Sequence, residues 1–320
     1  MVIFIGLTIN FLVPRLAPID PVQAVINRLL QYGGMYMDAS TVEAMRETMI
    51  DLYGLEGSLP EQYIRYLSRL VRGDFGPSLT MFPTPVIDII YNALPWTLGL
   101  LLTTMMLSWV LGNLAGGVSG YFSEKRWSKA MAMVATAIYP VPYYIMGLIL
   151  IILFVYLMPV FPMSGGFAIG LTPSFSLEFI FSLLTHSFLP ALSLVIVGSG
   201  WWFLSMRALV STIKTEDYVE YAEAAGIGRR KILSGYVIKN GMLPQITQLA
   251  LQAGGVFGGA LVTEYLFSYP GLGQILYMAV TNGDYNLIMG ISSFSVIAIA
   301  SAALVIDLIY PLIDPRVRRT

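Results

Sequence analysis

The chain has 320 residues, of which 56% are hydrophobic and 12% carry a charge, and its formal net charge is −1 at pH 7. Soluble domains carry about 25% charged residues, so a soluble core cannot bury this much apolar surface, whereas a lipid bilayer can. The near-zero net charge gives no reason to expect nucleic acid as a partner. The sequence contains no cysteine, which excludes disulfides, thiolate metal sites and cysteine nucleophiles. Its one histidine, His186, excludes a multi-histidine metal site.

The composition predicts an all-α integral membrane protein, and the apolar stretches predict six transmembrane helices. The first candidate, Val2–Val13, gives only about 18 Å of helix, which is too short to cross hydrocarbon about 30 Å thick. We interpret it as the outer part of a first span that is short or truncated. Five further stretches are long enough and contain no charged residue: Leu94–Phe122, Ala130–Met158, Ser187–Met206, Gln245–Thr263 and Leu287–Ile306.

The distribution of lysine and arginine predicts the orientation of these spans. The connecting segments Ser123–Lys129 and Arg207–Lys239 and the tail Arg316–Arg319 are basic, whereas Pro159–His186 and Ser268–Asn286 contain no lysine or arginine. Basic loops stay on the cytoplasmic side of a membrane. We therefore expect both termini to lie in the cytoplasm and the two uncharged-to-acidic loops to lie outside.

The chain divides into four expected parts. Residues 1–13 form the partial first span, residues 14–93 an external segment, residues 94–313 a five-helix core that includes the cytoplasmic loop 207–244, and residues 314–320 a cytoplasmic tail. Within the external segment, Ser40–Leu52 and Glu61–Val71 place their apolar residues on one helical face. Two short amphipathic helices beside the membrane fit a lid or docking platform, and fit equally a loop that covers the helix ends.

Proline and glycine predict irregular features within the spans. Pro140 and Pro142 lie in the middle of the expected third span, where proline removes a backbone donor and bends a helix. Gly112, Gly116 and Gly120 recur every four residues in the second span, a spacing that lets two helices approach closely. Such faces serve either as moving or dimerising surfaces or as ordinary contacts within a helical bundle.

The chain lacks both common sources of transport energy. It contains no G-x-x-x-x-G-K-[ST] phosphate-binding loop. It also has no ionisable side chain in the middle of a complete span, where ion-coupled transporters place one. The protein is therefore either a passive channel or carrier, or a passage that receives its energy from another subunit. A membrane-embedded enzyme would need paired polar groups at depth, and the charge-free spans offer none.

The most charged stretch, Glu220–Pro244, reads EYAEAAGIGRRKILSGYVIKNGMLP. Its acidic residues precede its basic residues, an order that complements a helix dipole. A helix that is merely solvated has no need of Ala222, Ala225 and Gly226 so close together. Small residues suit a surface that another protein approaches closely. Gly226 and Gly228 are also expected to end a first helix and turn the chain.

This stretch resembles the E-A-A-x-x-x-G loop of ABC importer permeases. Counting back from Gly226 places the motif glutamate at Glu220 and its second alanine at Ala222, with Tyr221 in place of the first alanine. Pro244 follows Gly226 by 18 residues, which resembles the longer spacing of the peptide/nickel permease family. Three further stretches resemble the first-permease (B-type) subunit of that family: Leu16–Pro21 (with Ile19 where glycine is usual), Phe267–Gly273 (FSYPGLG) and Asp314–Arg318 (DPRVR).

The resemblance implies a type I ABC importer permease in the plasma membrane of a prokaryote. It implies a second homologous permease subunit, two ATP-binding subunits and an external solute-binding protein as partners. ATP and magnesium would be bound by the partner subunits, and no cofactor is expected in this chain. The residues that would couple it to the ATPases are Glu220, Ala222, Ala225, Gly226, Ile227, Gly228, Arg229 and Arg230.

The remaining candidate residues concern the cargo and its delivery. Glu264, Tyr143 and Trp202 are candidates for the pathway or its gate, with a paired structural role as the alternative for Glu264. Asp284 and Tyr285, in the last outer loop, are candidates for contact with the binding protein. The resemblance implies di- or oligopeptides as cargo first, with oligosaccharides or nickel as alternatives.

Overall fold

The computed structural model describes residues 1–16, 22–23, 26 and 39–313, and the named elements of this part of the chain are helical. In chain order they are α1 (Val2–Leu16), α3 (Ala39–Leu52), α4 (Leu59–Val71), α5 (Val86–Tyr121), α6 (Arg126–Ile138), α7 (Tyr143–Ile151), η1 (Ile152–Leu157), α8 (Leu177–Ile213), α9 (Asp217–Ala224), α10 (Arg229–Lys231), η2 (Ile232–Ile238), α11 (Lys239–Ala253), η3 (Gly254–Gly258), α12 (Leu261–Leu266), α13 (Leu272–Asn282) and α14 (Tyr285–Ile313). The elements η1 and η2 are π-helical, and η3 is a 3₁₀ turn. The expected tail, residues 314–320, and most of the Leu16–Pro21 motif lie outside the described residues.

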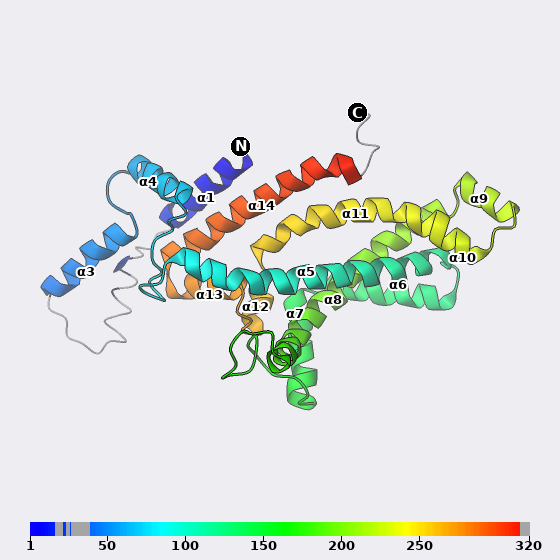
Figure 1. Cartoon of the computed structure of the whole chain (residues 1–320), viewed down its shortest axis with the longest axis horizontal. Helices are drawn as coiled ribbons and strands as arrows, with labels where there is room; N and C mark the ends of the chain where they lie inside the picture. The colour runs from blue at the N-terminus through cyan, green and yellow to red at the C-terminus, as the bar shows by residue number, and fades with distance from the viewer. Residues whose placement is uncertain (17–21, 24–25, 27–38, 314–320) are drawn as a thin grey trace.

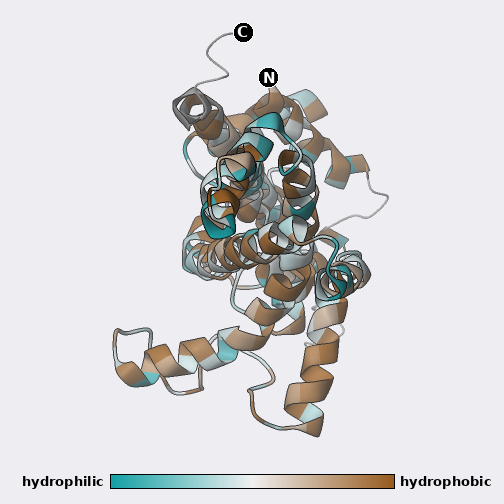
Figure 2. Ribbon diagram, turned by 90° about the vertical axis from the view of Figure 1, so that its right-hand side faces the viewer, coloured by the Kyte–Doolittle hydropathy of each residue, from teal (hydrophilic) through white to brown (hydrophobic). Residues whose placement is uncertain are grey.

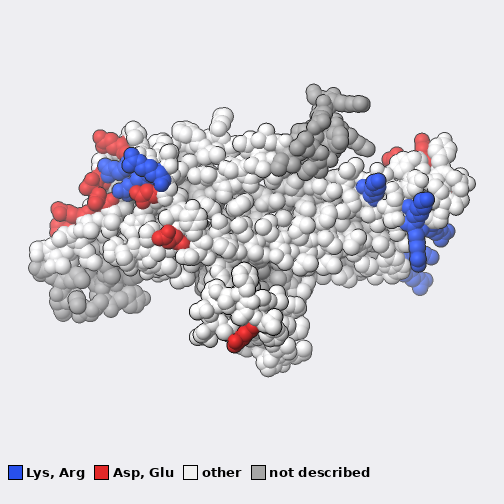
Figure 3. Space-filling model, in the orientation of Figure 1, with Lys and Arg blue, Asp and Glu red and all other residues white. Residues whose placement is uncertain are grey.

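The long helices α5, α8, α11 and α14 run along the longest axis of the molecule, as Figure 1 shows. The helices α3 and α4 lie at one end of this axis, and α9 and α10 lie at the other. Charged side chains gather over these two ends and are nearly absent from the middle of the visible face (Figure 3). Because charge is excluded from hydrocarbon, the membrane normal must lie close to this axis.

Within the described part of the chain, three helices are long and apolar enough to cross a membrane, namely Val86–Tyr121, Leu177–Ile213 and the first 22 residues of α14. A fourth candidate is the pair α6 and α7–η1, which is bent by 99° at the break between Ile138 and Tyr143. The predicted bend at Pro140 and Pro142 is therefore confirmed. The helix α1 is a shorter apolar helix that continues through Pro14. The count of six spans stays a prediction.

The expected fifth span, Gln245–Thr263, is wrong as a continuous helix. Its helix begins earlier, at Lys239, runs through Pro244 and ends at Ala253. The glycine-rich η3 follows, and the backbone then turns at Gly259, whose φ of 72° favours glycine. The glycines of this stretch, Gly254, Gly255, Gly258 and Gly259, therefore coincide with a break in the helix.

The helices α5 and α8 pack against each other through the glycines of the second span. A Cβ on Gly116 would overlap the backbone of Phe203, and one on Gly120 would lie 2.8 Å from the carbonyl oxygen of Arg207. In return, Gly198 of α8 leaves room for the side chain of Ser108. The close approach predicted from the four-residue spacing is confirmed, but its partner is another helix of the same chain rather than a second protein.

The corner between α7 and α8 extends away from the bundle and is mostly apolar, as the brown segments of Figure 2 show. Its most exposed apolar side chains are Ile169, Phe175, Leu177 and Phe181. Such a surface is stable only against lipid or another protein.

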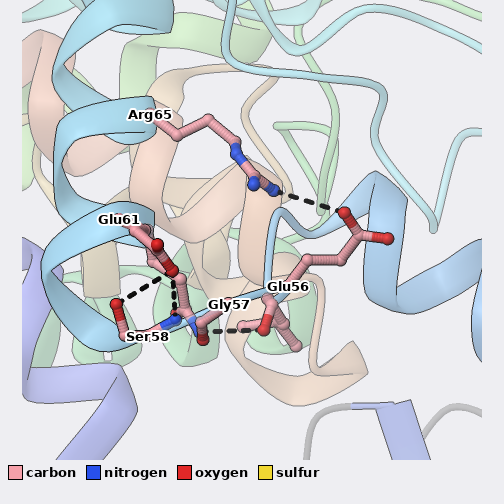
Figure 4. A network of polar contacts seen from close by, with 7 residues as sticks. Glu56, Gly57, Ser58, Glu61 and Arg65 are labelled. Carbon is pink, nitrogen blue, oxygen red and sulfur yellow. Dashed lines mark hydrogen bonds and ion pairs between the residues drawn. The ribbon is translucent and has the colours of Figure 1, made fainter.

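The external segment contains the two predicted amphipathic helices, α3 and α4. The start of α4 is held by Glu61, whose carboxylate accepts hydrogen bonds from the backbone N–H and the hydroxyl of Ser58 at 2.7 and 2.9 Å (Figure 4). These two bonds, the backbone one first, hold the pKa of the Glu61 carboxyl below its usual range. This is the capping-box arrangement that fixes a helix N-terminus.

Replacing Gly116 by alanine tests the α5–α8 contact. The added methyl group would meet the backbone of Phe203, which cannot move aside as a side chain does, so Gly116→Ala should destabilise the protein by about 1–3 kcal/mol. The matched control is Gly99→Ala on the same helix, where an added Cβ has no neighbour within 4 Å. Thermal unfolding followed by tryptophan fluorescence should show a lower midpoint for Gly116→Ala only; equal midpoints would contradict this contact.

Candidate functional site

The helix α9 ends in a glycine cap. The N–H of Gly226 donates to the carbonyl of Glu223 at 3.0 Å, and the N–H of Ile227 donates to the carbonyl of Ala222 at 3.1 Å. With the φ of Gly226 at 75°, these bonds form a Schellman motif. The prediction that Gly226 ends the helix is confirmed. An added Cβ on Gly226 would have no neighbour within 4 Å, so this glycine is required by its backbone angle and not by crowding.

One face of α9 packs onto the bundle. Val219 and Ala222 are 1% and 5% exposed and join a cluster with Met206 and Val210 of α8 and with residues of η2. The expectation that Ala222 offers its small side chain to a partner is therefore wrong, because its small size serves packing within this chain. The cluster fixes α9 to the charged end of the bundle.

The other face of α9 and the turn after it are open to solvent. Tyr221, which was not among the predicted coupling residues, is 76% exposed. The exposed residues of the predicted coupling set are Glu220, Ala225, Gly226, Gly228, Arg229 and Arg230. Ile227 is partly buried and packs against the cluster under α9. The exposed face thus presents a tyrosine, a small-residue turn and charges of both signs.

Polar contacts lock the bundle beneath α9. The guanidinium of Arg207 on α8 donates to the hydroxyl of Ser119 on α5 at 3.2 Å. Ser119 in turn shares a hydrogen bond of 2.8 Å with Ser128 on α6. Lys214, just after α8, donates to Ser123 in the α5–α6 turn at 2.8 Å. Three helices are therefore joined at the end that carries α9.

A cavity of about 290 Å³ lies in the middle of the bundle, between α5, α7, α8 and the break at η3. Tyr143 and Trp202, both predicted for a pathway, line it together with Thr104, Ser108 and Gln252. Both breaks in the apolar helices border this space, since Tyr143 begins α7 and Gly255 and Gly259 belong to the η3 break. Irregular backbone at membrane depth is tolerated where it lines such a cavity.

The lining of this cavity is uncharged and mostly apolar, with a few hydroxyl, amide and indole groups among leucine, methionine and valine side chains. None of the lining residues is Asp, Glu, Lys, Arg or His. The hydroxyl, amide and indole groups exchange hydrogen bonds with neutral polar atoms and hold no counter-charge for an ion. The space suits a neutral polar solute or the uncharged backbone of a larger one.

Glu264 lies outside the cavity and is fully buried. This position favours the paired structural role that was considered as the alternative to a role in the pathway. Its carboxylate accepts hydrogen bonds from the N–H of Gly273 at 2.6 Å and from the hydroxyl of Thr97 at 3.0 Å. The hydroxyl of Thr97 accepts from the N–H of Leu272 at 2.8 Å. The first two N–H groups of α13 are thus satisfied by side chains of α12 and α5, because Gly271 before them has no side chain to act as a cap. In this structure the carboxylate of Glu264 serves the cap of α13 and does not line the cavity.

Asp284 was predicted to contact a binding protein, and this prediction is wrong. Its side chain is fully buried and accepts hydrogen bonds from the hydroxyl of Ser78 at 2.6 Å and the N–H of Thr80 at 2.9 Å. Its other oxygen accepts from the N–H of Leu287 at the start of α14. Asp284 therefore fastens the external segment to α14. Tyr285 is partly buried beside Tyr53, with ring centroids 6.1 Å apart.

Sequence reasoning missed Thr97, Gln252 and the pair Thr104 and Ser108. Hydroxyl residues are common in apolar helices, where they often bond to their own backbone, as Thr104 does to the carbonyl of Leu100, so no local signal marks these positions. A glutamine at the expected depth of a span, where unpaired polar groups are costly, is the one signal that could have found Gln252.

Residues 112–319 match the family described as the binding-protein-dependent transport system inner membrane component. The chain is similar to the oligopeptide transport system permease protein AppB of Bacillus subtilis (strain 168), with 29% identity over 98% of this chain and 95% of the relative. It is also similar to the di/tripeptide transport system permease protein DppB of Pseudomonas aeruginosa (strain UCBPP-PA14), at 28% identity over 98% and 95% of the two chains.

A third relative is the probable D,D-dipeptide transport system permease protein DdpB of Escherichia coli (strain K12), at 30% identity over 97% of this chain and 92% of the relative. The family match covers more than half of the chain, and each of these relatives is matched over nearly its full length. The chain belongs to the family of inner-membrane components of binding-protein-dependent transport systems.

Thr97→Val tests the cap on α13. Valine keeps the shape of threonine but leaves the N–H of Leu272 without an acceptor and Glu264 without one donor, which should cost about 1–3 kcal/mol. Thr103→Val, at an exposed position of the same helix, is the matched control. Thermal unfolding should separate the two variants, and a Thr97→Val midpoint as high as that of the control would contradict the role of the cap.

Proposed function

We propose that this chain is one of two permease subunits of an ATP-driven importer and forms half of a pathway for di- or oligopeptides. The observation that carries the proposal is the near full-length similarity to permeases named for oligopeptide, di/tripeptide and D,D-dipeptide transport. The absence of charge from the lining of the central cavity supports it, because a peptide backbone presents neutral amides to the few hydrogen-bonding groups there.

In this proposal the energy enters through α9. ATP-binding subunits, which also carry the magnesium, dock on its exposed face, formed by Glu220, Tyr221 and Ala225 with the turn at Gly226 and Gly228. Arg229 and Arg230 contribute charged contacts at the rim. An external solute-binding protein delivers the cargo at the α3–α4 end, and a second homologous permease closes the other half of the pathway. The α9 end then lies in the cytoplasm of a prokaryotic cell, together with both termini.

Cargo is tested with the assembled importer. The chain is reconstituted in liposomes with its second permease and its ATPases, and ATP-dependent uptake of a labelled dipeptide, an oligosaccharide and nickel is measured in the presence of the external binding protein. We expect dipeptide uptake that requires ATP. Uptake of the oligosaccharide or of nickel without uptake of the dipeptide would show that peptide is not the cargo. ATP-independent uptake by this chain without its partners would instead support a stand-alone channel or carrier.

Ala225→Arg tests the docking face. Ala225 is exposed, so a long charged side chain should leave the fold intact while blocking close approach by an ATPase. A substitution in the centre of an interface typically costs 2 kcal/mol or more, so ATPase binding and cargo-stimulated ATP hydrolysis should fall by about tenfold or more.

The matched control for Ala225→Arg is Ser68→Arg, at an exposed position of α4 at the opposite end of the molecule. This variant should keep both activities. Normal ATPase binding by the Ala225→Arg variant would contradict the docking role of α9, and it would not affect the assignment of the chain to its family.

A further inference from the structure

A small cavity at the α3–α4 end is lined by three arginines. Arg15, at the end of α1, and Arg65 and Arg69 of α4 border a space of about 50 Å³. One buried water needs roughly 10–15 Å³ by the same kind of measure, so this space accommodates a group of a few oxygen atoms. Two positions of α4 one turn apart thus place their side chains at the same void as the last turn of α1.

The charge of Arg15 has no acidic partner among the described residues. Its Nε donates to the amide oxygen of Gln62 at 3.0 Å, and its Nη1 donates to the carbonyl of Phe11 at 3.2 Å. Its guanidinium carbon lies 3.8 Å above the centre of the Phe11 ring. All of these contacts are neutral, and a guanidinium carries five N–H donors, so donors remain for a further ligand.

Of the two other arginines, Arg65 pairs with Glu56 at 3.7 Å, with the side chains 37% and 55% exposed, and a pair of this kind contributes little to stability (Figure 4). Arg69 has no ion pair with an acid among the described residues. The only acid that lines the cavity is Asp74, and its Oδ1 already accepts from the N–H of Gly76 at 2.9 Å. Figure 3 shows these basic side chains next to acidic ones at this end of the molecule.

The surroundings of the cavity are those of a membrane edge. A second cavity of about 230 Å³ adjoins the first, shares Arg15 and Gln62 with it, and adds Pro14, Leu55 and Leu59. Beside it, Leu16 and Ile64 are 78% and 66% exposed. Polar guanidinium groups next to an apolar hollow and exposed aliphatic side chains match a lipid at the interface, with its phosphate on the arginines and its glycerol and acyl region in the hollow.

We propose that Arg15, Arg65 and Arg69 form a binding site for the phosphate group of an anionic phospholipid in the outer leaflet. Arginine binds phosphate oxygens through charge-assisted, often bidentate hydrogen bonds, which supplies the missing counter-charge. The bound lipid holds α4 against the end of α1. The site is separate from the central cavity and from α9, so it does not depend on the proposed cargo.

The test uses the purified importer complex in detergent and compares phosphatidylglycerol with phosphatidylcholine by native mass spectrometry and thermal unfolding. Wild type should retain phosphatidylglycerol in preference to phosphatidylcholine and unfold at a higher temperature with it. The double variant Arg65→Gln/Arg69→Gln should lower the apparent affinity for phosphatidylglycerol by about tenfold or more. Arg72→Gln is the matched control, because Arg72 follows α4 directly, is exposed and does not line the cavity.

Three outcomes would overturn the proposal. The first is equal retention of phosphatidylglycerol by wild type and the double variant. The second is an equal loss in Arg72→Gln, which would indicate general charge attraction. The third concerns inorganic phosphate: if it stabilises the complex in phosphatidylcholine and phosphatidylglycerol adds nothing, a free anion occupies the arginines and not a lipid. Displacement of bound phosphatidylglycerol by inorganic phosphate, with loss of the added stability, would support the assignment of the phosphate position.

Discussion

The backbone contact between α5 and α8 is the constraint on which the rest of the fold depends. Gly116 and Gly120 on one helix and Gly198 on the other bring the two main chains together over several turns. In a bilayer, where the hydrophobic effect does not drive helices together, such close packing supplies much of the attraction. Because both helices span the long axis, their contact fixes features at both ends of the molecule.

Hydrogen-bonded polar side chains join the other elements to this pair of helices. At the end that carries α3 and α4, Thr97 of α5 and Glu264 satisfy the start of α13, and Asp284 joins Ser78 to α14. At the other end, Arg207 and Ser119 join α8 to α5. Each of these groups is paired, so it contributes rigidity without the large cost of an unpaired polar group away from water.

Local features of the fold were predictable from the sequence, and long-range pairings were not. Pro140 and Pro142 act on their own helix, so the bend was predicted, and Gly226 could be predicted as a helix end for the same reason. The glycine spacing around Gly116 indicated a close contact but carried no information on which helix would fill it.

The errors in the site have one physical origin. Asp284 and Glu264 pair with side chains 206 and 167 residues away, and no periodicity connects positions so distant in the chain. In the sequence, an acidic residue in a loop or at a helix end looks available for a partner protein until the groups that donate hydrogen bonds to it are known. The prediction that Ala222 contacts a partner failed for a related reason, since a small residue fits a contact within the chain as well as a contact with another protein.

The path from α9 to the cavity follows from α8. Met206 and Val210 anchor the inner face of α9, and Leu194, Gly198 and Trp202 line the cavity on the same uninterrupted helix. Because the main chain of α8 packs directly against that of α5, α8 is expected to shift as a unit and not to bend locally. The opposite walls of the cavity are the two broken segments, at Tyr143 and at Gly255–Gly259, where the backbone has fewer helical hydrogen bonds to lose. A displacement of α9 is therefore expected to move one rigid wall against two compliant ones, which changes the shape of the cavity without requiring α5 and α8 to separate.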